Sequence, residues 1–473
     1  MPHRRFLRLC VLVALCFYGA LMFAGVELPA AEPRNAPKEP GFPGGLPAVL
    51  DLKTAQRLAL EANLSLSAAQ ARAAQTRERV RQAWSRYLPR LEGSASATHV
   101  RPAENQTASL PSLGFPSRVT GLSGIEREDV YSASLSATLT LFDGFQREFS
   151  LAASRFQEES SKAAYREAQR LLLAAVADSY FVAQLARERR HIADADEAFN
   201  ARQLKDAQAR EALGAGSLSD VLNFQVQVNL ARAQKIQADQ ETRVALAGLA
   251  ALMGLPEGAF DNRTTLAPLT DLDPSLLTPP SVPEALNYAF DHRPDLQQAR
   301  WLARAAHATV GSAKSRFSPT LSLFGTLEGS RTHTGRFEDD DFGSSAGISL
   351  VVPLFSGGED FFKVREAEQV RREAEKNVEN RAVEAASQVR AAVEEILGAQ
   401  EQFRLQSENA LLVQKTRDLV EKEYAAGQAS LVRLTQAQRD LVQAQSQRAQ
   451  SRISLENAWI RFHAATGRIL EEF

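Results

Sequence analysis

Apolar residues recur along most of this chain with the period of an amphipathic helix, interrupted twice by segments of period two. The longest helical tracts run from Phe145 to Leu213, without proline or glycine, and from Phe361 to Ala426, with Gly398 as the only glycine. Heptad-spaced apolar residues stand among Gln, Glu, Arg and Ala there, as in coiled coils. At 1.5 Å per residue, each tract predicts a helix roughly 100 Å long.

A glycine ends each long tract, at Gly214 and Gly427, and a shorter amphipathic segment follows each glycine. This arrangement is typical of two antiparallel helices joined by a tight tip. The sequence therefore predicts long helical hairpins over 145–254 and 359–467. Shorter amphipathic helices are expected before the strands, over 52–87 and 282–317, and Pro89 and Pro319 end them.

The segments of period two predict β-hairpins at about 89–141 and 319–354. From Tyr131 to Thr140 every second residue is apolar and the others are Ser or Thr, and 345–350 repeats this less regularly. Such a strand has one apolar and one hydroxyl face, which also suits a half-buried sheet of a soluble domain. About ten alternating residues is the length of a tilted transmembrane strand. Together with the export signal described below, the pattern favours membrane strands.

The same module occurs twice in the chain. Residues 85–91 (SRYLPRL) return 230 positions later as 315–321 (SRFSPTL), and 141–144 (LFDG) return 213 positions later as LFSG. The tip glycines share the second offset. The 17-residue difference lies between Pro89 and Phe142, where a surface loop tolerates it. We therefore predict a first module over 51–254, a linker over 255–282 and a second module over 283–473.

The first 30 residues read as an export signal, because three arginines precede an apolar run from Leu9 to about Val26. A retained membrane anchor is the alternative. A proline-rich tether is expected over 31–50. Both cysteines lie in the leader, so a cleaved chain has none, and the bulky Leu15 disfavours lipid attachment at Cys16.

Composition and motifs offer no catalytic site. The net charge is −2 without clustered basic residues, which argues against nucleic-acid binding. Seven histidines are scattered without metal-ligand spacing, and no phosphate loop, nucleophile elbow or HExxH motif is present. The acidic run 338–341 is a candidate for divalent ions, but a solvated loop is expected. The sequence predicts no enzyme, no cofactor and no metal.

The number of strands bears on assembly. Four strands cannot close a barrel, and an open sheet edge cannot lie in lipid. Two chains would give about eight strands and no useful bore, whereas three would give about twelve and room for a channel. We therefore expect an α+β membrane protein, most simply a trimer, in which the chains share one β-barrel and the long helices continue it as an α-helical barrel.

This combination resembles the outer-membrane efflux protein (TolC-like) family of Gram-negative bacteria. The resemblance rests on the repeated module, on 293–296 (RPDL), on FDG at 142–144 and FSG at 355–357, and on the tips. It implies a homotrimer in outer-membrane lipid that extends into the periplasm. Through a periplasmic adaptor it would dock on an inner-membrane pump, as the exit duct for tripartite efflux or type I secretion.

The resemblance also implies a periplasmic gate at the tips. Six positions after each tip glycine, where an acid is common, stand Asp220 and Arg433; nine after stand Asn223 and Gln436, where some relatives have an acid. Tyr424 matches a tyrosine that holds the tips shut against the first acid. Solvated helix-end residues are the alternative. Arg433 departs from an all-acid entrance, so we expect a weaker cation preference.

The tips are also the expected contacts for the adaptor, because exposed apolar residues there need a partner. Capping of the return helices is an equally good role for the two serines. The tip residues are Gly214, Ser217, Leu218, Gly427, Ser430 and Leu431.

One alternative class remains open on sequence alone, a periplasmic coiled-coil adaptor or structural linker whose alternating segments form a soluble sheet. That class predicts one helical hairpin, whereas two are expected here. The sequence does not select the cargo among drugs, metals and secreted polypeptides, and it does not identify the pump.

Overall fold

The computed structural model describes residues 47–100, 128–255, 260, 265–269 and 272–471. The predicted signal peptide, Cys16, most of the tether, the loop 101–127 and parts of the linker lie outside these residues. No helix within the described residues combines the length and the apolar character needed to cross a bilayer.

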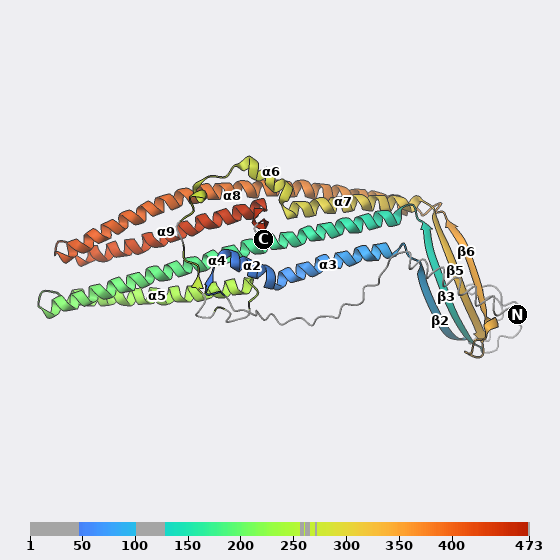
Figure 1. The fold of residues 1–473 in the computed structure, drawn as a ribbon, viewed down its shortest axis with the longest axis horizontal. Coiled ribbons are helices and arrows are strands. Elements are labelled where there is room, and N and C mark those ends of the chain that lie inside the picture. The colour runs from blue at the N-terminus through green and yellow to red at the C-terminus, as the bar shows by residue number, and fades with distance from the viewer. Residues whose placement is uncertain (1–46, 101–127, 256–259, 261–264, 270–271, 472–473) are drawn as a thin grey trace. The chain divides into compact units, whose positions relative to one another are not determined.

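Helices make up most of the described chain. The first set comprises α2 (Leu52–Ala62), α3 (Leu64–Ser85), α4 (Gln146–Ala212) and α5 (Leu218–Leu252). The second set comprises α6 (Val282–His292), α7 (Pro294–Lys314), α8 (Glu359–Ala425) and α9 (Leu431–Thr466). Both α4 and α8 have 67 residues. Figure 1 shows α4 packed antiparallel to α5, and α8 to α9, as the two predicted helical hairpins require.

The shorter predicted helices are each broken in two, so the expectation of single helices over 52–87 and 282–317 was wrong. Asn63 has an extended conformation between α2 and α3, and its side chain accepts a hydrogen bond from the Leu66 amide at the start of α3. Pro294 is the first residue of α7 and restricts Arg293 to an extended conformation. In both places the residue at the N-cap position of the second helix also ends the first, although only Asn63 makes a capping hydrogen bond.

Four antiparallel strands form one sheet in the order β2-β3-β5-β6. They are β2 (Arg90–Val100), β3 (Glu128–Phe142), β5 (Thr320–Thr332) and β6 (Phe342–Val351). Within the described chain, β2 and β6 each have a strand partner on one side only. A second, two-stranded sheet pairs β1 (Val49–Leu50) with β4 (Thr265–Leu266), so the end of the predicted tether is hydrogen-bonded to the predicted linker. Short 3₁₀ turns lie at Pro274–Leu277, Ser315–Phe317, Asp339–Asp341 and Arg468–Leu470.

The two β-hairpins have the same register. Leu91 pairs with Ala137 in the first hairpin. The equivalent residues are Leu321, 230 positions after Leu91, and Leu350, 213 positions after Ala137, and they pair in the second hairpin. Hydroxyl groups face each other across neighbouring strands, with Oγ atoms 2.8 Å apart in Ser94–Ser134 and in Ser96–Ser132. Thus the hydroxyl face predicted from the alternation is present.

The helix breaks contact the ends of the return helices in both halves. The Asn63 amide donates a 2.8 Å hydrogen bond to the Leu252 carbonyl at the end of α5. At the equivalent positions, the Arg293 guanidinium donates a 2.8 Å bond to the Ala465 carbonyl at the end of α9. Each contact satisfies a carbonyl that a helix end would otherwise leave without a partner. We call these two contacts the amide clasp and the guanidinium clasp.

Arg293 is the most deeply buried charged residue of the described chain, with 1% of its surface exposed. It donates two hydrogen bonds to the Asp295 carboxylate, of 3.0 and 2.7 Å, and one of 2.9 Å to Gln388 on α8. Burial raises the pKa of Asp295, but hydrogen bonds and charge from Arg293 outweigh burial and hold that pKa below its usual value. The ionised pair therefore stabilises the fold at neutral pH, and its contribution is lost as pH falls through the lowered pKa.

Removing Arg293 would take two hydrogen bonds and the paired charge from the half-buried Asp295 carboxylate, and it would take the side-chain donor from the Ala465 carbonyl. We expect Arg293→Ala to lower the free energy of unfolding by about 3–5 kcal/mol, as the loss of one member of a buried ion pair does. Arg300→Ala on the exposed face of α7 is the matched control, with an expected change within about 0.5 kcal/mol. Denaturant unfolding of the detergent-extracted protein measures both, and equal midpoints for the two variants would contradict the role of the clasp.

Candidate functional site

The hairpin tips depend on two glycines in the left-handed region of backbone space. Gly214 has φ +74° and Gly427 has φ +75°, and no atom lies within 4 Å of where a Cβ would stand on either. After each long helix the chain closes with hydrogen bonds from Ala215 to the Arg210 carbonyl and from Gln428 to the Glu423 carbonyl. Glycine is therefore needed at the tips for its conformation rather than for close packing.

The tip serines cap the return helices. The Ser217 hydroxyl accepts a hydrogen bond from the Ser219 amide, and the Ser430 hydroxyl accepts one from the Arg433 amide. The capping role considered from the sequence is thus present in the structure.

The apolar tip residues divide into exposed and packed side chains. Leu218 is 61% exposed, whereas Leu431 is half-buried. Two further tip residues, Leu213 and Val432, are 84% and 74% exposed and were not singled out from the sequence. Their positions beside the tip glycine and the capping serine were the available signal. The tips therefore present exposed apolar side chains that no described part of the chain covers.

An apolar cluster joins the two helical hairpins close to the tips. It contains Phe199 and Phe224 from the first hairpin with Val420 and Leu434 from the second, all buried. The Tyr424 ring packs edge-on against Phe224, with ring centroids 6.2 Å apart. Within this chain, the two hairpins are therefore held together near their tips by buried apolar side chains.

Tyr424 lies between a cation and an anion of the first hairpin. The Arg210 guanidinium carbon is 5.5 Å from the centre of its ring. Burial raises the pKa of the Tyr424 hydroxyl, the negative charge of Asp220 raises it further, and Arg210 opposes both. No hydrogen bond joins Asp220 and Tyr424 within the described protomer, so the interaction between them is electrostatic. The structure brings these two predicted gate residues into one neighbourhood.

The other predicted gate residues contact their own hairpins. Asn223 donates to the Ser219 carbonyl, and Gln436 donates to the Asp440 carboxylate at 2.7 Å. Arg433 forms an ion pair with Glu423 across the second tip, with 3.1 Å between Nη1 and Oε2. The positive charge that distinguishes this tip is therefore compensated locally, by a residue that sequence reasoning missed.

Further from the tips, a buried polar contact joins the hairpins. Gln438 on α9 donates a 2.7 Å hydrogen bond to the Asp196 carboxylate on α4. Burial raises the pKa of Asp196, and the bonds from Gln438 and Asn200 oppose that effect. Asp196 lies in a helix tract that reads as ordinary coiled coil, so its burial had no signal in the sequence.

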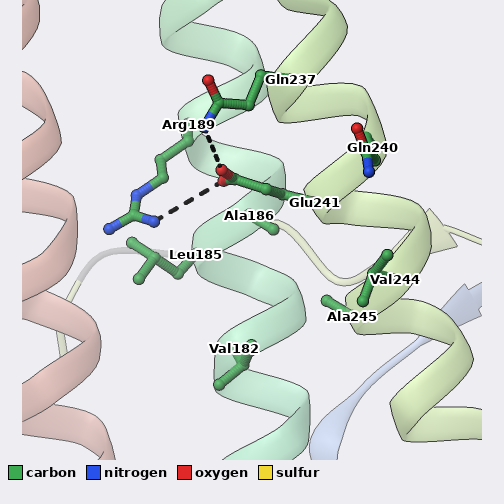
Figure 2. Close-up of a pocket in the computed structure, with 9 residues that line it drawn as sticks. All are labelled: Val182, Leu185, Ala186, Arg189, Gln237, Gln240, Glu241, Val244 and Ala245. Carbon is green, nitrogen blue, oxygen red and sulfur yellow. Dashed lines mark hydrogen bonds and ion pairs between the residues drawn. The ribbon is translucent and has the colours of Figure 1, made fainter.

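A groove of about 620 Å³ lies along the surface between α4 and α5 (Figure 2). Its charged residues pair with each other, since Arg189 lies 3.9 Å from the Glu241 carboxylate and Gln237 donates to that same side chain. Val182 and Val244 at its wall are exposed. The groove is thus lined mainly by apolar side chains, and the charges of Arg189 and Glu241 in its lining compensate each other.

The acidic run 338–341 forms a capped 3₁₀ turn. Arg331 pairs with Glu338 at 3.1 Å and with Asp341 at 3.0 Å. Across the described residues, no group of three or more His, Cys, Asp or Glu side chains is placed to hold a metal ion.

Comparisons with known proteins extend over most of the chain. The family model described as outer membrane efflux protein matches residues 55–255 and 285–468. The alkaline protease secretion protein AprF of Pseudomonas aeruginosa is 28% identical over 361 residues, which are 73% of this chain and 71% of the relative. The probable efflux pump outer membrane protein TtgC of Pseudomonas putida is 27% identical, covering 77% of this chain and 75% of its own.

A solved structure shares the fold. The outer membrane protein VceC from Vibrio cholerae superposes with a TM-score of 0.70 at 19% identity, over 88% of this chain and 96% of its own.

The tip geometry predicts opposite effects for two glycine substitutions on the same hairpin. Gly427→Ala forces a Cβ into a left-handed conformation, and we expect a loss of about 1–2 kcal/mol in the free energy of unfolding. Gly398→Ala, at an exposed position inside α8 with no atom near the new Cβ, should gain about 0.5–1 kcal/mol. Unfolding midpoints followed by circular dichroism measure both, and shifts of the same sign would contradict the assignment of strain to the tip.

Proposed function

Because the chain belongs to the outer membrane efflux protein family, we propose that it is a homotrimeric exit duct of the outer membrane. It would passively pass substrates from a periplasm-spanning machine to the outside, as part of a tripartite efflux pump or a type I secretion system. The named relatives include a secretion protein and an efflux pump component, and the proposal covers both classes.

The observation that carries the proposal is the two-faced sheet joined directly to long helices. Its hydroxyl face continues from the first hairpin to the second, since Ser136 pairs with Thr326 and the hydroxyl oxygens of Thr326 and Ser345 are 2.6 Å apart. On the other face Leu135, Ile348 and Leu350 are more than half exposed in a single chain. We assign the hydroxyl face to a water-filled interior and the apolar face to outer-membrane lipid.

The open edges of the sheet support assembly into a trimer. Among the described residues the sheet has four strands with free edges at β2 and β6, and such a sheet requires further strands before it can lie in lipid. Three chains would supply about twelve strands for a shared barrel, and their helices would continue it as an α-helical barrel.

The tips are the proposed contact for a periplasmic adaptor protein, which would connect the duct to an inner-membrane pump. Leu213, Leu218 and Val432 provide exposed apolar side chains there. The alternative of a coiled-coil adaptor is disfavoured, because the chain has two helical hairpins of matched length and belongs to a family of outer membrane proteins.

Native mass tests this function most directly. We expect a three-chain particle when the protein is extracted from outer membranes in mild detergent, because the strand edges need partners. Multi-angle light scattering on the extracted particle, corrected for detergent, is the measurement. A water-soluble monomer after export would contradict the duct.

For the gate, we propose that Asp220 and Tyr424 hold the periplasmic end closed. The double variant Asp220→Ala with Tyr424→Phe should raise single-channel conductance in planar bilayers. The tip then loses both the Asp220 charge and the Tyr424 hydroxyl dipole that are proposed to hold it closed. Gln225→Ala on the same helix is the control, since that exposed side chain donates to Asn229 of its own helix. Unchanged conductance in the double variant would count against the gate. The reversal potential in the same bilayers tests the weaker cation preference that is expected because Arg433 stands where an acid is common. Strong cation selectivity would contradict it.

A further inference from the structure

We propose that a pocket between α3, α4 and α7 is a binding site for a phosphate group, carried either by a phospholipid headgroup or by a small soluble ion. The pocket has a volume of about 340 Å³, and two arginines of α3, Arg79 and Arg86, line it. It shares no residue with the helical tips or with the groove of Figure 2. The site depends on residues of this chain, and only its level relative to the membrane rests on the proposed function.

The first observation is positive charge without a counter-charge. Arg79 and Arg86 are about two helical turns apart on α3, roughly 10 Å, so they lie on the same face of the helix. Both side chains are exposed, and within the described chain neither guanidinium forms an ion pair or a hydrogen bond. By contrast, Arg81 on the same helix pairs with Glu78 at 2.7 Å. Among the described residues that line the pocket, none is acidic.

The second observation is a difference between the two modules at this position. Arg86 corresponds to Arg316, which lies 230 positions later. The Arg316 guanidinium donates a 2.6 Å hydrogen bond to the Asp360 carboxylate. The residue equivalent to Asp360, 213 positions earlier, is Arg147, which is itself paired with Asp143 at 2.9 Å. The first module therefore keeps the arginine without the acid that compensates it in the second.

The third observation is that neutral side chains add hydrogen-bond donors to the pocket. Ser150 of α4 and Ser312 of α7 line it, with their Oγ atoms 3.4 Å apart. Because one hydroxyl of the pair donates to the other, the second keeps a proton for a ligand. The side-chain amides of Gln82 and Gln157 also line the pocket and form no hydrogen bond with the described chain. The lining thus combines charged and neutral donors.

A phosphate group is the ligand that this set of donors suits. Guanidinium groups bind phosphate oxygens through pairs of N–H donors, and hydroxyl and amide donors can satisfy the remaining oxygens. With a volume of about 340 Å³, the pocket is at the lower end of the range for small-molecule sites. That size fits a headgroup or a small phosphate better than a bulky ligand.

The pocket lies where the helices meet the sheet. Helix α3 ends at Ser85, directly before Arg86, and β2 begins at Arg90. Helix α7 ends at Lys314, two residues after Ser312. Figure 1 shows α4 between α3 and α7 at this end of the helices. In the proposed duct the sheet crosses the bilayer, so the pocket would lie near the headgroup region on the periplasmic side.

Isothermal titration calorimetry of the delipidated, detergent-extracted protein tests the site, with a short-chain phosphatidylglycerol and sodium phosphate as separate probes. We expect Arg79→Gln with Arg86→Gln to weaken binding at least about tenfold, because two charged donors are lost. Arg72→Gln with Arg77→Gln is the matched control. It removes the same charge from exposed positions of α3 outside the pocket, and it should change binding less than about twofold because salt screens distant charges.

A second variant keeps both arginines in place. Gln146 is exposed at the start of α4, and its equivalent in the second module is Glu359, which lies 3.9 Å from Arg316. We expect Gln146→Glu to place a carboxylate near Arg86, where it competes with the phosphate, and to weaken binding by roughly two- to fivefold.

The two probes distinguish the sources of the phosphate group. Binding of the lipid without binding of sodium phosphate identifies a headgroup as the ligand, whereas binding of sodium phosphate identifies the phosphate group itself. Binding of neither probe, or equal affinities in the arginine double variant and its control, would overturn the site. A trimeric native mass without phosphate binding would overturn the site and leave the proposed function intact, and a monomer that binds phosphate would do the reverse.

Discussion

The rest of this structure depends on the open edges of β2 and β6, where no further strand of the described chain pairs with the backbone hydrogen-bonding groups. A strand edge in water is satisfied by solvent, but within a bilayer each unpaired N–H or C=O costs several kcal/mol. The alternation of apolar residues and hydroxyls shows which face of the sheet suits lipid and which suits water. The side chains on these faces do not provide hydrogen-bond partners for the backbone groups at the edges. In the proposed duct a single chain would therefore be incomplete, and further copies would supply the missing strand partners.

In the helical part of the structure, backbone carbonyls at the helix ends find their hydrogen-bond partners within one chain. The ends of α5 and α9 are each closed by a side chain from a helix break, in the amide clasp and the guanidinium clasp. The chemistry differs between the two halves although the geometry is the same. In the second half, Arg170 on α4 donates to the neighbouring carbonyl of Ala464, so two buried guanidiniums converge on one helix end. The cations also suit the negative end of the helix dipole.

Much of the fold could be predicted from local pattern, because period and punctuation are local properties. Residues 131–140 showed both their strand and its two faces, and Gly214 and Gly427 marked turns that require a left-handed backbone. The breaks at Asn63 and Arg293 were missed, because a polar capping residue inside an amphipathic pattern resembles any solvated helix position. Their role depends on carbonyls about 190 and 170 residues away, which no local pattern reports. The buried Asp196 was missed for the same reason, because its partner Gln438 is 242 residues away. The Arg433–Glu423 pair was missed because it joins two helices across the turn at the tip, whereas Tyr424 and Asp220 were found by resemblance.

The β3–β5 contact also has a kinetic meaning. Linking two modules in one polypeptide turns every second seam of the proposed ring into an intramolecular event. Only the remaining seams depend on encounters between molecules in the envelope. A ring of six separate modules would face twice as many collisions, each exposing strand edges to mispairing. Gene fusion would in this way have supplied an assembly pathway as well as a structure.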